Sequence, residues 1–407
     1  MPNISTIELY VPPPADHEIG AAYARLMLGL AQRVPNLVAD YWGPEAWLDE
    51  VTKTPPTWEA LRNHAVAVAT AAQQSELPKN RRERILRNVR AALWLIRAGE
   101  GEKIMFTEQV RMLLDLKPEG ADSEVFAAAH TTLEEMLPRY KLEGDLADES
   151  LADRWQTWRD HLLIPATEAM PLLQEAMTTL HGIVADGSEG MQVVLGEPSD
   201  GPEFTYHRGA LTVNPNAALR LDRIYHMAAQ WGHGGLHSVY SALRHRYDGQ
   251  GDAECTLLLN LGPDQVLIQG LPQAILAGFD IYESALPALM KQTGHDKLDS
   301  EALRTFHLIE DALQWVQANV VLMLHSEGLR PRAVRRHLID TALMTREAAD
   351  TLLTTLGDPI PAAHEFAPRL GGQLLTQWLA KSECSVMSLL ADPPVPSTML
   401  FDIRFQD

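Results

Sequence analysis

Apolar residues recur at helical spacing through most of this 407-residue chain. Between residues 17 and 33 they fall three or four positions apart, which places them on one face of a helix. The same spacing predicts helices over about 58–75, 78–98, 104–116, 122–137, 148–186, 217–247, 264–292, 300–327, 331–341, 346–356 and 371–381. Thr57 is a good N-cap, and breaks are expected before Pro165 and Pro171. The pattern predicts a mainly α fold.

The spacing of apolar residues changes in one short region. Residues 191–196 and 204–213 are rich in β-branched and aromatic residues and are bounded by Gly, Pro and Asp, which is typical of strands. We expect a small β-ribbon at about 191–213 and a short strand in the tail, at 399–405. The polar stretch 144–149 is the expected seam between an N-terminal helical part, 1–145, and a second helical part, 146–407, within one compact unit.

Charge and cysteine content exclude several classes of function. The chain has 34 Lys and Arg against 54 Asp and Glu, a net charge of −20, which disfavours nucleic acid and anionic membranes as partners. Its 2 cysteines fit a reducing compartment, although one long-range disulfide stays open. The sequence shows no signal-peptide pattern and no apolar run long enough to span a bilayer, so we expect a cytoplasmic protein.

Residues 205–243, where a strand leads into a helix, contain the strongest candidates for chemistry. In an uninterrupted helix, His226, Gln230, His233 and His237 would share one face, and the i, i+4 pair His233 and His237 could chelate zinc. Three glycines at 232, 234 and 235 each cost a helix about 1 kcal/mol, which argues against that helix. The stretch also lacks the glutamate of a His-Glu-x-x-His peptidase motif. Hydrogen-bonded histidines and zinc ligands therefore both stay open.

The same stretch resembles the bacterial domain-of-unknown-function 885 family, whose members are similar to zinc-dependent peptidases of the zincin type. The residues in register are Tyr206, Arg208-Gly209, Asn214, Leu221-Asp222-Arg223 and Ala228-Ala229. The family continues with Ala-His-Glu-x-x-Pro-Gly-His-His and, thirty to forty residues later, Ser-Glu-Gly. The resemblance implies a zincin-like multi-helical fold with a small β-ribbon next to the central helix.

The metal-binding positions of that family pattern are changed in this chain. Gln230 and Trp231 stand at the first His and the Glu, Leu236 and His237 replace the His pair, and Gln269 stands at the acidic position. Amide oxygens bind zinc poorly, and an indole can neither ligate zinc nor accept a proton. The resemblance therefore implies a lost hydrolytic site with no catalytic residue and no cofactor. His325 and Gly328 match a later family motif, in which Gln317 and Val321 replace an Arg and an Asp.

Our hypothesis is that the chain is a catalytically degenerate zincin-like relative whose former active-site cleft binds a small molecule or peptide without hydrolysing it. The residues expected to line this cleft are Tyr206, His207, Gln230, Trp231, His237, Gln269 and His325. One alternative is a metal-dependent hydrolase that uses zinc at His233 and His237, with Glu254 or Glu283 as third ligand. A third reading is an interaction protein whose cleft is packed shut.

Overall fold

The N-terminal helices follow the predicted apolar stripes closely. The computed structural model describes residues 16–140, 149–184, 188, 190–279, 281–283, 285–294 and 299–405. Its first helices are α1 (Asp16–Ala31), α2 (Glu45–Lys53), α3 (Trp58–Gln74), α4 (Lys79–Gly99), α5 (Phe106–Leu114) and α6 (Ser123–Met136). Thr57 caps α3 by accepting the N–H of Ala60 at 3.2 Å, as predicted. Helix α2 was not predicted.

The break predicted before Pro165 is present, but the one before Pro171 is wrong. Helix α7 (Leu151–His161) ends ahead of strand β2 (Leu163–Pro165), and α8 (Ala166–Val184) then runs through Pro171. A proline inside a helix costs about 3 kcal/mol. Eight side chains of α8 are buried, and fully burying one Leu- or Met-sized side chain contributes about 1.5 to 3 kcal/mol. Burial of that apolar face outweighs the proline.

The predicted ribbon is a three-stranded sheet of β3 (Gln192–Leu195), β4 (Phe204–His207) and β5 (Ala210–Val213). β5 lies in the centre, parallel to β3 and antiparallel to β4. The single strand expected over 204–213 is wrong, because Arg208 and Gly209, with φ of 46° and 86°, turn the chain into a hairpin. Two strand pairs were not predicted: β1 (Val38–Tyr41) with β7 (Leu257–Leu259), and β2 with β6 (Ala218–Arg220).

The remaining helices are α9 (Ile224–Trp231), α10 (Leu236–Gln250), α11 (Asp264–Gly278), α12 (Ala285–Gln292), α13 (Ser300–His325), α14 (Pro331–Ala342), α15 (Arg346–Leu356), α16 (Pro359–His364), α17 (Phe366–Ser382), α18 (Val386–Ala391) and α19 (Pro396–Phe405). The helices predicted over 217–247 and 264–292 are each interrupted. The strand expected at 399–405 is wrong, because α19 packs on α17 as a helix, with Met399 buried. Two 3₁₀ turns, η1 (Leu221–Arg223) and η2 (Ala253–Thr256), precede α9 and β7.

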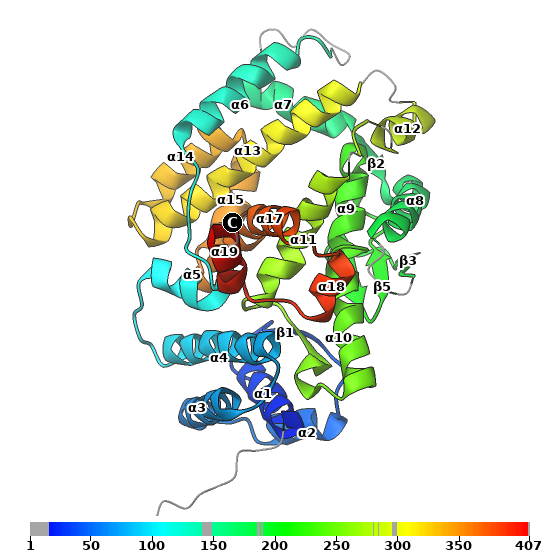
Figure 1. Ribbon diagram of the computed structural model, residues 1–407. Coiled ribbons are helices and arrows are strands. Elements are labelled where there is room, and N and C mark those ends of the chain that lie inside the picture. The colour runs from blue at the N-terminus through cyan, green and yellow to red at the C-terminus, as the bar shows by residue number, and fades with distance from the viewer. Residues whose placement is uncertain are drawn as a thin grey trace, which may run out of the picture.

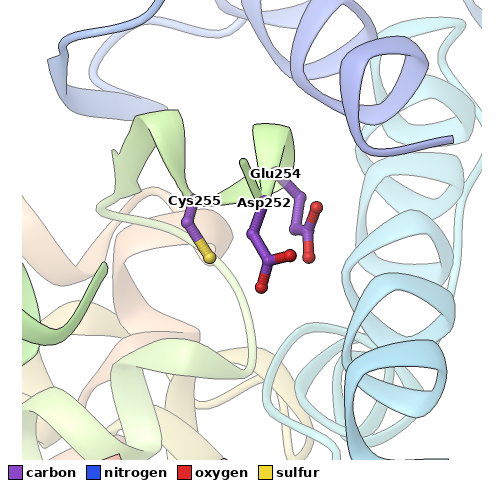
Figure 2. Close-up of side chains that lie close together, drawn as sticks. All are labelled: Asp252, Glu254 and Cys255. Atoms are coloured by element: carbon purple, nitrogen blue, oxygen red, sulfur yellow. The ribbon is translucent and has the colours of Figure 1, made fainter. Parts of the chain in front are cut away.

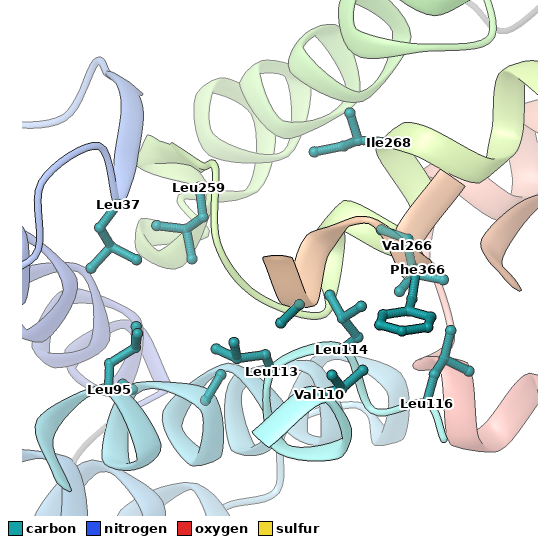
Figure 3. Packing of buried hydrophobic residues seen from close by; sticks show 14 of the residues in the cluster. Leu37, Leu95, Val110, Leu113, Leu114, Leu116, Leu259, Val266, Ile268 and Phe366 are labelled. Carbon is teal, nitrogen blue, oxygen red and sulfur yellow. The ribbon is translucent and has the colours of Figure 1, made fainter. Parts of the chain in front are cut away.

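Buried apolar residues form two clusters. The first joins α1, α3, α4 and α5 to β7, α11 and α17, and Figure 3 shows Leu114 of α5 near Val266 and Phe366. The second joins α7, α8, α9 and α13. The first cluster contains residues from both sides of position 145, while the seam predicted at 144–149 lies outside the described residues except for Glu149. None of the described helices has both the length and the apolar content needed to cross a bilayer.

Helices α11 and α17 cross at close range near the middle of the molecule (Figure 1). Glycines make this approach possible: a Cβ on Gly270 would lie 2.7 Å from Cα of Gly371. The crossing holds Gln273 against Gly372, and both residues line a pocket described below.

Candidate functional site

Four residues, 232–235, separate α9 from α10, and Figure 1 shows the two helices stacked one above the other around this break. Gly234 has a φ of +96°, and a Cβ on Gly235 would lie 2.7 Å from the carbonyl carbon of Gln230. Ser238 accepts the N–H of Gly234 at 2.7 Å and so fixes the start of α10. The uninterrupted helical face that would carry His226, Gln230, His233 and His237 is therefore absent, because the glycines break the helix.

The break turns His233 inward, into what we call the junction cluster: His181, Ser188, Tyr206, His233 and His237. His233, 2% exposed, has its Nδ1 atom 2.9 Å from the Ser188 hydroxyl and 3.3 Å from Nδ1 of His181. The Tyr206 hydroxyl lies 3.0 Å from the Nδ1 atom of His237. The rings of His233 and His237 are nearly perpendicular, at 84°. Their Nδ1 atoms therefore have different partners.

Tyr206 and His207 alternate on β4 and so face opposite ways. Burial, followed by the neighbouring Tyr240, raises the pKa of Tyr206, so its hydroxyl stays protonated and is able to donate a hydrogen bond to His237. The side chain of His207 is 67% exposed and lies 3.7 Å from Asp40. Of the residues expected to line the cleft, the structure brings Tyr206 and His237 together and directs His207 elsewhere.

The other residues expected in the cleft are dispersed. Gln230 is exposed, and Trp231 is half-buried with its ring 5.6 Å from that of Phe204. Gln269 donates to Gln265 along α11, at 3.3 Å. His325 stacks on Phe106 of α5, and its Nε2 lies 2.7 Å from the Leu356 carbonyl oxygen, so it belongs to the packing between α5, α13 and α15.

A pocket with a volume of about 680 Å³ lies between α9, α11, α13 and α17. We call it the polar pocket. Its polar lining residues are Arg223, His226, Gln273, Tyr282, Arg304, His307, Asp311, Gln373, Thr376 and Gln377.

A chain of polar contacts crosses one wall of the polar pocket. Arg223 donates to Nδ1 of His307 at 2.6 Å, and Nε2 of His307 lies 3.1 Å from Asp311 and 3.3 Å from Nε2 of His226. The Tyr282 hydroxyl lies 3.4 Å from the same His226 nitrogen. A guanidinium can only donate, so the network assigns the proton of His307 to Nε2, which donates to Asp311. His226 then accepts at Nε2.

His226 is held in its neutral form. Burial lowers the pKa of His226 well below its usual value, and the charge of Arg223 adds to this. Its Nδ1 atom is buried without a hydrogen-bond partner in the described structure. The 3.3 Å between the two Nε2 atoms matches the edge of a tetrahedral zinc site, roughly 3.3 Å for bonds of about 2.0 Å. A proton on Nε2 of His307 leaves it no lone pair for zinc, so the pair fits hydrogen bonding instead.

An ion cluster behind the pocket fixes Arg223 and α13. Glu310 accepts two hydrogen bonds from Arg220, at 2.6 and 2.9 Å, and lies 3.7 Å from Arg223. Asp222 shares Arg220, at 2.6 Å. Burial works to raise the pKa of Glu310, but the charges of Arg223 and Arg220 outweigh it and lower the pKa to about 2.

Asp252, Glu254 and Cys255 form the one group of three potential metal ligands found among the described residues (Figure 2). All three are buried, but the carboxylates are already paired: Arg81 lies 2.7 Å from Asp252 and 2.5 Å from Glu254. Arg246 adds a bond of 2.9 Å to Asp252.

Burial raises the pKa of the Cys255 thiol to about 11, so it is not a thiolate at neutral pH. The group therefore fits an ion network rather than a metal centre. Glu254, one proposed third ligand for His233 and His237, belongs to this network. Glu283, the other, lies 3.3 Å from Arg304.

Sequence reasoning missed the partners that come from distant segments. His181 precedes His233 by 52 positions, and His307 follows His226 by 81. His307 and Asp311 are four residues apart on α13, a spacing visible in the sequence, but nothing local indicates that this face meets α9.

Comparisons with known proteins show distant structural likeness. No protein-family model matches the sequence, and a search of curated proteins finds no match. A candidate lipoprotein from Colwellia psychrerythraea is 10% identical, with a TM-score of 0.49 over 89% of this chain and 69% of that one. A candidate lipoprotein of unknown function from Shewanella oneidensis is 9% identical, with a TM-score of 0.43 over 94% of this chain and 82% of that one.

Proposed function

We propose that this protein binds a small polar molecule or short peptide in the polar pocket without hydrolysing it. In this proposal the chain is a catalytically degenerate relative of zincin-like metallopeptidases that acts in the cytoplasm. The observation that carries the proposal is the pocket itself, about 680 Å³ in volume, with polar side chains at ten of its fourteen lining residues.

None of the residues expected in the cleft lines the polar pocket, but two of them lie on helices that form its walls. Gln230 follows His226 by four positions on α9, and Gln269 precedes Gln273 by four positions on α11. Residues four apart lie on the same side of a helix, so both glutamines extend the helix faces that line the pocket. This supports the idea that the pocket is part of the former active-site cleft.

The lining favours a ligand rich in amide or hydroxyl groups. Gln273, Gln373 and Gln377 each offer one acceptor and two donor hydrogens, the complement of a peptide group. The glutamine amides are not general bases, the lowered pKa of His226 makes its imidazole a weak one, and the Asp311 carboxylate is paired with His307. These features support binding without hydrolysis.

A binding experiment tests the proposal directly. Ligand-observed NMR with a panel of di- and tripeptides, followed by calorimetry on the hits, should identify a binder of the wild type. The double variant Gln273→Leu/Gln377→Leu removes two neutral hydrogen bonds, each contributing about 0.5 to 1.5 kcal/mol, so binding should weaken by roughly 5- to 150-fold. Gln74→Leu, an exposed glutamine on α3, is the matched control. Binding that the double variant leaves unchanged would contradict the proposal.

A second arm separates binding from hydrolysis. The hits are incubated with the wild type and their products analysed, while zinc content is measured in protein purified without added metal. We expect intact peptide with the wild type, whatever its zinc content. The variant Gln230→His/Trp231→Glu/Gln269→Glu, which restores ligands implied by the resemblance, should bind more zinc than the wild type. Cleavage by zinc-loaded wild type that is lost in His237→Ala would favour the hydrolase using His233 and His237.

A further inference from the structure

The junction cluster places two imidazole nitrogens face to face. Nδ1 of His181, in the last turn of α8, lies 3.3 Å from Nδ1 of His233, in the glycine break. Two nitrogen ligands that each lie about 2.0 to 2.1 Å from one tetrahedral cation are separated by roughly 3.3 Å. The two histidines therefore already have the spacing that such a cation requires.

Hydrogen bonding alone does not account well for the contacts that Nδ1 of His233 makes with His181 and Ser188. Nδ1 of His233 faces both His181 and the Ser188 hydroxyl, which is 2.9 Å away. An imidazole Nδ1 offers either one proton or one lone pair, so it cannot make a full-strength hydrogen bond to both neighbours. A cation between the two imidazole nitrogens would use both lone pairs at once, and Ser188 supplies a neighbouring oxygen.

The surroundings leave room for the rest of a coordination sphere. His181 and His233 line a pocket of about 420 Å³ between α8 and β3, distinct from the polar pocket. His181 is exposed, which gives a cation a route of entry. The C-terminal end of α8, where His181 lies, carries the negative end of the helix dipole, and this favours a cation.

The glycines after His233 fix the position of its backbone. Gly234 requires a positive φ, and Gly235 approaches the backbone of α9 so closely that a side chain would collide with it. These two constraints hold the imidazole of His233 in a buried place with its Nδ1 directed at His181. A preorganised ligand of this kind binds metal at a lower entropic cost.

We propose that His181 and His233 form a binding site for a divalent transition-metal cation such as Zn²⁺ or Co²⁺, completed by water or by a ligand in the adjoining pocket. Imidazole suits these ions, whereas Mg²⁺ and Ca²⁺ prefer oxygen ligands. The site differs from the pair His233 and His237, because His237 directs its Nδ1 at Tyr206. It is also independent of peptide binding in the polar pocket.

The test uses the full chain, freed of metal with a chelator. It is titrated with Zn²⁺ by calorimetry and with Co²⁺ by visible absorption. The informative variant is His181→Ala, because an exposed side chain can be removed without disturbing the core. His245→Ala removes another exposed histidine, on α10, as the matched control. Circular dichroism verifies that each variant is folded, and peptide binding is measured in parallel.

We expect one Zn²⁺ per chain in the wild type and in His245→Ala, and at least a tenfold loss of affinity in His181→Ala, with peptide binding unchanged. Tetrahedral Co²⁺ bands should appear in the wild type and vanish in His181→Ala. Saturable binding of equal affinity in the wild type and His181→Ala would overturn the site. So would the absence of saturable binding by the wild type, in which case the two imidazoles are a hydrogen-bonded pair. Neither result would affect the test of the polar pocket.

Discussion

Glu310 offers a quantitative test of how the polar pocket is held together. Its pKa is about 2 in the folded protein against 4.5 for an ordinary glutamate. At about 1.4 kcal/mol for each tenfold change in proton affinity, the ionised carboxylate stabilises the fold by about 3 kcal/mol. Replacement by glutamine keeps the shape of the side chain but leaves Arg220 and Arg223 without this counter-charge, while Asp222 still pairs with Arg220.

We therefore expect Glu310→Gln to lower the free energy of unfolding at pH 7 by about 3 kcal/mol. The sign of the pH dependence follows from the lowered pKa: the contribution is complete above pH 4.5 and is lost as the pH falls toward 2. The difference between wild type and variant should thus be constant from pH 7 to 5 and should shrink steadily below that.

Urea denaturation followed by circular dichroism at pH 7, 5 and 3 measures this difference. Glu327→Gln, an exposed glutamate just beyond α13, makes the same chemical change and controls for the altered net charge; it should stay within about 0.5 kcal/mol of the wild type. A loss below 1 kcal/mol at pH 7 for Glu310→Gln, or a loss that is equal at pH 7 and pH 3, would refute the reasoning.

Two further predictions concern packing and thiol chemistry. Gly270→Ala should lower the free energy of unfolding, measured by urea denaturation, by about 1 to 3 kcal/mol, because the added methyl group meets the backbone of Gly371. The control is Gly278→Ala on the same helix, where an added Cβ would meet no described atom within 4 Å, and it should not be destabilising. Ellman's reagent should titrate Cys384 in the folded chain and Cys255 only after denaturation, because Cys255 is buried with a pKa of about 11; two thiols reacting at equal rates in native buffer would contradict this.

Helix content could be predicted from the sequence because an apolar stripe is a local signal. The helices of the N-terminal part matched within a few residues, and Thr57 identified the start of α3 correctly. The break between α9 and α10 could also be predicted, because the cost of three glycines argued against a continuous helix through His237. A local pattern cannot show which distant segment an element packs against. Strand β1 pairs with β7 across more than 200 residues, and neither strand is long enough to have a distinctive sequence pattern.

The errors have physical causes of the same kind. Pro171 was expected to end a helix, but burial of the apolar face of α8 outweighs one lost hydrogen bond. A short strand was expected in the tail, yet the tail is a helix that lies against α17, where Trp378 donates to Asp402.

Tyr206 and His237, both expected to line the cleft, lie in contact with each other, a pairing that the sequence did not predict. The resemblance named positions and could not show that α13 would bring His307 beside His226. His325, expected with them, instead stacks on Phe106.

Helix α9 is only eight residues long, about 12 Å from end to end. It carries His226 on the wall of the polar pocket and runs directly into the glycines that hold His233. The wall of the polar pocket and the glycine break therefore share one short element of two turns. A substitution that displaces α9 as a whole should disturb His226 and His233 together. Removal of a single side chain that leaves α9 in place should disturb one of them alone.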